Sequence, residues 1–158
     1  MTPTNRPISA IAVPASTKKT NYPDPFAILV AGREKHKLGD WFGLTNFGVN
    51  LTTLAPGAIS ALCHAHARQD ELIYVLEGRP TLIVGEAEYQ LEPGQCIGFK
   101  AGTGIAHQVM NRTDTIARFL EIGDRTPHDT VEYPQDDLQA VLNDAGQWVF
   151  KHKDGTPY

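Results

Sequence analysis

Four side chains near the middle of the chain have the types and the spacing of metal ligands. His64 and His66 lie two residues apart, and Glu71 follows after a break of four residues. On a β-strand, residues two apart point to the same face, so both imidazoles would face one side. His107 lies far downstream, beyond a glycine-rich loop. A closed barrel could bring it back to the other three.

These residues would form a mixed nitrogen and oxygen site. Such a site suits iron, manganese, nickel, cobalt, copper or zinc, and it suits calcium or magnesium poorly. On a five- or six-coordinate metal, four protein ligands leave open positions for substrate, water or dioxygen. A His-x-His pair alone is more often a packed or exposed pair than a metal site, and a glutamate at a strand start is usually solvated. The prediction therefore depends on the combination.

Short strands separated by turns are the elements that would position these residues. Apolar and β-branched runs predict strands over 26–30, 47–54, 59–66, 71–77, 81–84, 87–91, 95–99, 105–110 and 115–122. Turns recur every 8 to 12 residues or so, which is typical of an antiparallel sandwich or barrel. One helix is expected over 136–142, and the basic run 33–37 is interpreted as a solvated loop.

The predicted strand 71–77 is apolar on both faces. Alternation puts Ile73 and Val75 on one face and Leu72, Tyr74 and Leu76 on the other. A strand with one wet face would alternate apolar and polar residues, so we expect the outer face to be covered. A second copy of the chain would cover it in a homodimer; the chain's own N-terminal arm and another sheet are the alternatives.

Composition predicts one compact domain. The chain has 158 residues, of which 41% are hydrophobic, and a formal net charge of -4. We divide it into an N-terminal arm, 1–24, which holds four prolines, and a barrel with its C-terminal extension, 25–158. There is no basic stripe that would neutralise phosphates, so nucleic acid is not an expected partner.

The expected location is the cytoplasm, with no membrane association. No apolar run approaches the length of a membrane span, and the N-terminus lacks the basic start and apolar stretch of a secretory signal. Cys63 and Cys96 show no Cys-x-x-Cys spacing, and two buried free thiols are expected in a reducing compartment. Cys63 precedes His64 directly, so its side chain should point away from the ligand face.

Two sequence patterns here resemble the two motifs of the cupin family. They are Gly57-x6-His64-x-His66-x4-Glu71-x6-Gly78 and Gly94-x5-Lys100-x-Gly102-x4-His107-x3-Asn111, which together span about a third of the chain. Three details depart from the usual pattern. Six residues, not five, separate Gly57 from His64; Lys100 replaces a proline; and the loop to His107 aligns through Gly102 or Gly104.

The resemblance implies an all-β, single-domain cupin, meaning a double-stranded β-helix or jelly-roll barrel, here with a short C-terminal helix. It also implies one divalent transition metal held by His64, His66, Glu71 and His107. Some cupins bind their metal with three histidines alone. If the register slips by one residue, Asp70 would take the place of Glu71.

The fold does not fix the function, because cupins include oxygenases, isomerases, lyases, epimerases, storage proteins and ligand sensors. An intact ligand set favours a metal-dependent enzyme acting on a small organic substrate, of the oxygenase, isomerase or lyase type. The alternative is a non-catalytic cupin that binds or senses a small molecule. Tyr74, Arg118 and Glu121 are candidates for an acid or base, but strand parity does not show which of them face the pocket.

Overall fold

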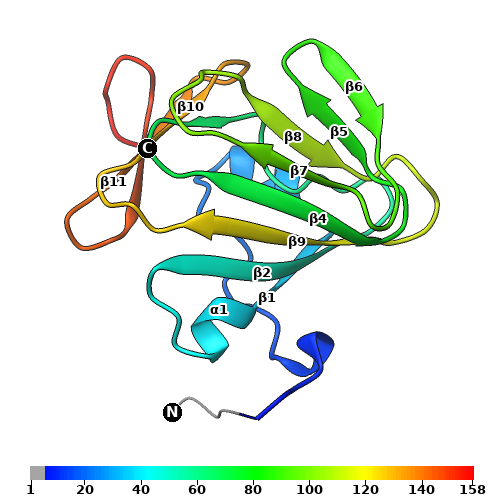
Figure 1. The fold of residues 1–158 in the computed structure, drawn as a ribbon. Coiled ribbons are helices and arrows are strands. Elements are labelled where there is room, and N and C mark those ends of the chain that lie inside the picture. Colours follow the sequence, from blue (N-terminus) through cyan, green and yellow to red (C-terminus); the bar gives the residue numbers. More distant parts are fainter. Residues whose placement is uncertain (1–5) are drawn as a thin grey trace.

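The computed structural model describes residues 6–158, and most of its regular structure is β-strand (Figure 1). In this range the strands are β1 (Arg33–Lys37), β2 (Phe47–Leu54), β3 (Ala65–His66), β4 (Glu71–Glu77), β5 (Thr81–Val84), β6 (Ala87–Gln90), β7 (Cys96–Phe99), β8 (His107–Met110), β9 (Ala117–Asp124), β10 (Thr130–Tyr133), β11 (Leu138–Leu142) and β12 (Trp148–Lys151). One α-helix, α1 (Leu38–Trp41), and two 3-10 helices, Ala10–Ala12 and Phe26–Val30, accompany them.

Three antiparallel sheets build the barrel. The first has the order β1-β2-β9-β4-β7, the second β12-β11-β10-β3, and the third β6-β5-β8. Isolated bridges from Ile59 to Met110 and from His64 to His107 tie the segment before β3 to β8. Figure 1 shows the first and third sheets facing each other across the molecule. The expected all-β barrel is confirmed.

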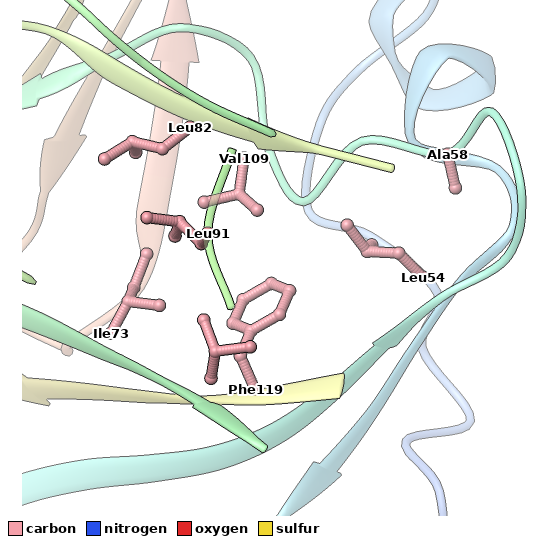
Figure 2. Close-up of a cluster of buried hydrophobic side chains, with 8 residues drawn as sticks. Leu54, Ala58, Ile73, Leu82, Leu91, Val109 and Phe119 are labelled. Carbon is pink, nitrogen blue, oxygen red and sulfur yellow. The ribbon is translucent and has the colours of Figure 1, made fainter. Parts of the chain in front are cut away.

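The core lies between these two facing sheets. Its buried members are Leu54, Ala58, Ile73, Val75, Leu82, Leu91, Val109 and Phe119. Figure 2 shows Leu82 and Val109 lying over Ile73 and Phe119, so side chains from the two sheets meet. Along the inward faces of β4 and β9 this apolar row continues into acidic positions, Glu71 and Glu121. The same two strands therefore form the core at one end and present carboxylates at the other.

Two predicted elements have the wrong type. Residues 26–30 form a 3-10 helix rather than a strand, and this helix buries its first and last side chains, Phe26 and Val30. The helix expected over 136–142 is absent there. Strand β11 occupies 138–142 instead and buries Leu138 and Ala140 with the period of two that a strand imposes. The α-helix of the described chain is α1, near the N-terminus.

Two other predictions need correction in position or extent. The basic run 33–37 is strand β1 at a sheet edge rather than a solvated loop. His36 within it is buried and contacts the carbonyl oxygen of Val13 at 2.5 Å, so the N-terminal arm covers its outer side. Of the strand expected over 59–66, only Ala65–His66 pairs regularly, and the rest makes isolated bridges.

The N-terminal arm runs along β1. Ala15 bridges His36, and the backbone N–H of Ser16 donates to the carbonyl of Lys35 at 2.8 Å. The arm therefore lies at the far edge of the first sheet from β4, and it leaves the row of Leu72, Tyr74 and Leu76 exposed. Residues 1–5 of the expected arm lie outside the described range, and the boundary at residue 24 stays a prediction. Within residues 6–158 no helix is long and apolar enough to cross a membrane.

Candidate metal centre

His64, His66 and Glu71 come together as the spacing predicts. One potential ligand atom from each lies within 4.8 Å of the others. His66 is in β3 and Glu71 begins β4, so the intervening turn folds the carboxylate back over the imidazoles. His107 begins β8 directly opposite His64, with backbone hydrogen bonds in both directions of 3.1 and 2.9 Å. The centroids of these two imidazoles are 4.6 Å apart.

Two of the three histidines are oriented through their Nδ1 atoms. His64 Nδ1 lies 2.8 Å from the carbonyl oxygen of Leu62, and His66 Nδ1 lies 2.6 Å from Oδ2 of Asp129. A carbonyl or carboxylate oxygen can only accept, so each Nδ1 must carry a proton. In the neutral ring Nε2 then keeps its lone pair, which is the state that a metal ligand needs.

His107 is held by packing instead. Its ring stacks on Phe99 with centroids 3.5 Å apart and an interplanar angle of 5°. Its Nε2 lies 3.2 Å from Glu71 Oε2, and His64 Nε2 lies 3.8 Å from the same oxygen. The Nδ1 atom of His107 is buried and has no hydrogen-bond partner among residues 6–158. The Nε2 atoms of both rings thus face one carboxylate oxygen.

The electrostatics keep Glu71 ionised. Burial alone would raise the pKa of this carboxyl, but hydrogen bonds and charge from His107 and His64 outweigh it and hold the pKa well below its ordinary value. Burial lowers the pKa of His64, and Glu71 more than compensates, so it lies above the ordinary value. For His107, burial prevails and the pKa is lowered. The site offers an anion beside at least one neutral imidazole.

This donor set fits a divalent transition metal. Imidazole nitrogens with one carboxylate suit that class of ion, and the orphaned Nδ1 of His107 leaves Nε2 as the atom facing the cluster. Asp70, the alternative to Glu71, is exposed and accepts the backbone N–H of Ala101 at 2.8 Å. Lys100 is exposed as well, so its place at the usual proline position carries it to solvent.

The cluster opens into a cavity of about 750 Å³, and Ile73 shares its lining. Of the three acid–base candidates, only Glu121 lines this cavity. Tyr74 is exposed on the outer face, and Arg118 pairs with Glu77 at the surface. The Nζ atom of Lys35 lies 2.5 Å from Glu121 Oε2, and Oε1 accepts no hydrogen bond from the described residues.

Sequence reasoning missed two residues that shape the site. Asp129, which is fully buried, holds both His66 and the backbone N–H of Arg68. Lys35 reaches Glu121 because residues 33–37 form strand β1. From sequence these residues are interpreted as a loop, and so the contact is missed. Period-two alternation of Arg33, Lys35 and Lys37 was the available signal for β1. No sequence signal pointed to Asp129, which lies in a loop far from the histidines along the chain.

The arm also contributes a wall of the cavity. Tyr22 lines it with Tyr133, and the centroids of the two rings are 5.8 Å apart in an edge-to-face arrangement. Burial raises the pKa of both phenols, so they are neutral across the physiological range. The cavity is thus enclosed by the barrel on one side and by residues before Pro25 on the other.

Comparison with known proteins gives a consistent result. A family model described as the cupin domain matches residues 50–123. The crystal structure of a sugar phosphate isomerase from a cupin superfamily, from Silicibacter pomeroyi DSS-3, is 38% identical, with coverage of 97% of this chain and 96% of that chain and a TM-score of 0.90. A protein of Acidithiobacillus ferrooxidans ATCC 23270, for which sugar phosphate isomerase activity is proposed, is 31% identical over 80% of each chain, with a TM-score of 0.72.

A third solved structure matches at the level of the fold alone. The polyketide cyclase of Streptomyces resistomycificus is 20% identical, with a TM-score of 0.62 over 75% of this chain and 78% of that chain. None of the curated proteins matches the chain.

Proposed function

Because this chain belongs to the cupin superfamily, we propose that it is a metal-dependent isomerase acting on a phosphorylated sugar. The observation that carries the proposal is the Glu121 carboxylate, which shares a cavity with the imidazole cluster but takes no part in it. One route for interconverting an aldose and a ketose uses a single group that removes a proton from carbon and returns it to the neighbouring carbon. The two relatives named or proposed as sugar phosphate isomerases support this reaction class.

His64, His66, Glu71 and His107 are the proposed metal ligands. A divalent metal bound there would supply Lewis-acid polarisation of the substrate oxygens. The His64 and His66 rings are fixed by Leu62 and Asp129, so their lone pairs are oriented before any ion arrives. This set of imidazole and carboxylate donors suits iron, manganese, nickel, cobalt, copper and zinc, so the proposed metal is one of these six.

Glu121 is the proposed proton-transfer group. Register places it opposite Ile73, and Glu71 opposite Gly123, so the two carboxylates are diagonal neighbours on the inward face of β4 and β9. The backbones of such diagonal neighbours lie about 7–8 Å apart, so the two side chains start from adjacent positions on the same face. Lys35 donates to Oε2 and fixes the carboxylate, while Oε1 stays free to accept a proton. In the proposed step Oε1 takes the proton from the hydroxyl-bearing carbon next to the carbonyl, and the hydroxyl proton of that carbon passes to the carbonyl oxygen. Oε1 then returns its proton to the former carbonyl carbon, so the hydroxyl and the carbonyl exchange places with no net gain or loss of protons.

The test is turnover in deuterium oxide. Protein loaded separately with each metal is incubated with a panel of aldose and ketose phosphates, and NMR follows interconversion and deuterium incorporation at carbon. We expect both for at least one pair, and Glu121→Gln should lose both while keeping its metal. Glu77→Gln, on the exposed surface, is the matched control. A metal-loaded protein that binds sugars but exchanges no carbon-bound hydrogen would show a binding protein instead.

Assembly and location complete the proposal. We infer a homodimer formed through the row of Leu72, Tyr74 and Leu76, whose exposed fractions are 38%, 39% and 46%. A contiguous apolar face of this kind marks an interaction surface. We place the enzyme in the cytoplasm, where free thiols such as buried Cys63 and exposed Cys96 persist.

A further inference from the structure

Strand β1 converts a basic run of sequence into a row of cations that faces the cavity. Arg33, Lys35 and Lys37 alternate with Glu34 and His36, and period two places the three cations on one face. All three line the same cavity as the imidazole cluster. Lys35 is paired with Glu121, but the other two form no ion pair with any residue in the range 6–158. Arg33 and Lys37 are therefore cations on the cavity wall that no described carboxylate pairs with directly, although Glu34 and three aspartates also line this cavity.

Arg33 is the most constrained of these cations. Its Nη1 atom donates to the carbonyl of Ser60, and its Nη2 atom donates to the carbonyl of Lys19 at 3.0 Å. Its Nε atom is buried and has no hydrogen-bond partner in the described part of the chain. Carbonyl groups orient a guanidinium but carry no net charge. A partly buried cation without a counterion costs free energy, so a compensating anion is expected to come from a ligand.

The arm adds two lysines to the same end of the cavity. Lys18 and Lys19 both line it, and neither forms an ion pair with a described residue. Their backbone is fixed there, because Ser16 Oγ donates to the Lys18 carbonyl at 3.0 Å and Arg33 holds the Lys19 carbonyl. The far end of the same wall is different, since Arg125 there is paired with Asp40. Three cations without an ion pair in the described range, Arg33, Lys18 and Lys19, thus gather where the arm crosses the start of β1, whereas Lys37 lies alone at the other end of the strand.

We propose that Arg33, Lys18 and Lys19 bind the phosphate group of the substrate. A phosphate dianion matches a guanidinium fork combined with ammonium groups, which give charge-assisted hydrogen bonds. The sugar would then extend from the arm toward Glu121 and the imidazole cluster. This inference rests on the proposed function for the identity of the substrate, but phosphate binding can be measured without turnover.

The experiment compares the double variant Lys18→Gln/Lys19→Gln with the control Lys151→Gln/Lys153→Gln, which lies outside the cavity. Arg33→Gln is added, and because it loses two backbone contacts, its fold is checked by circular dichroism and metal content. Inorganic phosphate is titrated calorimetrically into metal-loaded and metal-free protein, so that binding at the metal is separated from binding at the arm. We expect the cavity variants to weaken phosphate binding about tenfold or more in the metal-free protein. The control should bind as the unmodified chain does.

Kinetics provide the second readout. For the sugar phosphate that is turned over, the double variant should raise KM about tenfold with little change in kcat. The reason is that the lysines would bind the phosphate equally in the bound substrate and in the transition state. If the unmodified protein turns over no sugar phosphate, the proposed isomerase function is rejected. The phosphate titration then still tests whether Arg33, Lys18 and Lys19 bind phosphate. Unchanged phosphate affinity and KM in the double variant would overturn the subsite. So would tighter binding of a sugar carboxylate than of the matching sugar phosphate.

Discussion

At the scale of single residues, the imidazoles are the part of the site whose role can be tested most directly. His64→Ala and His107→Ala should each lose most of the bound transition metal, because each removes a nitrogen that faces Glu71. Elemental analysis of the purified proteins measures this. His128→Ala, at an exposed position paired only with Asp144, is the matched control. Full occupancy in the His64/His107 double variant would contradict the proposed centre.

Asp129 is expected to act through His66. Asp129→Asn keeps an oxygen for the backbone N–H of Arg68 but replaces the carboxylate that holds His66 Nδ1 at 2.6 Å. Metal affinity should fall about 10- to 100-fold, as is usual when such an orienting partner is lost. Competition with a chromophoric chelator measures the affinity. Asp144→Asn, at an exposed site, should leave it unchanged, and an equal affinity in both variants would argue against the orienting role.

Glu71 should make the metal-free protein sensitive to acid. Its pKa is lower in the folded than in the unfolded state, so its contribution to the free energy of unfolding is present above the unfolded pKa, about 4.3. That contribution is lost as pH falls through the folded pKa. Urea unfolding at a series of pH values measures the loss. Glu71→Gln should flatten this acid limb, whereas Glu132→Gln, on the exposed face of β10, should retain it.

At the scale of elements, the turn after β4 sets a strict requirement for glycine. Gly78 has a φ of +77°, and a Cβ there would lie 2.4 Å from the carbonyl oxygen of Ile116. Gly85, in the β5–β6 hairpin, has a φ of +57° but open space around it. Gly85→Ala should lower the free energy of unfolding by about 1–2 kcal/mol, the cost of the left-handed conformation alone. Gly78→Ala should lower the free energy of unfolding clearly more, because the added Cβ also meets the Ile116 carbonyl. Urea unfolding measures both variants, and equal losses of free energy would contradict this close approach.

Elements with clear alternation could be predicted from sequence, and those set by tertiary contacts could not. Strands 47–54 and 71–77 have the predicted bounds, because their patterns and flanking turns are unambiguous. The sequence pattern predicts a helix over 136–142, yet residues 138–142 form a strand because they pair with β10. The grouping of His64, His66 and Glu71 in space could be predicted from their spacing. Alternation could have indicated strand β1, but the contact of Lys35 with Glu121 depends on how the strands pair in the sheet, and that of Asp129 with His66 depends on the path of a loop. No local pattern encodes either contact.

At the scale of the whole molecule, the outer face of β4 predicts self-association. Light scattering at micromolar concentration should give the mass of a dimer, because the arm leaves Leu72, Tyr74 and Leu76 exposed. Tyr74→Lys with Leu76→Glu should shift the mass to that of a monomer while circular dichroism stays unchanged. Ile28→Lys, at a position that is 73% exposed on a different element, is the control. A monomeric mass for the unmodified chain would remove the proposed interface.

The arm along β1 also bears on how the protein can be shortened or fused. A gene designed to begin at Pro25, the domain boundary suggested by composition, would encode every proposed metal ligand. It would discard Lys18, Lys19 and Tyr22, which line the cavity, and would expose the buried edge at His36. Such a fragment could take up metal yet fail to retain substrate. Tags are therefore better placed upstream of residue 6 than in place of the arm.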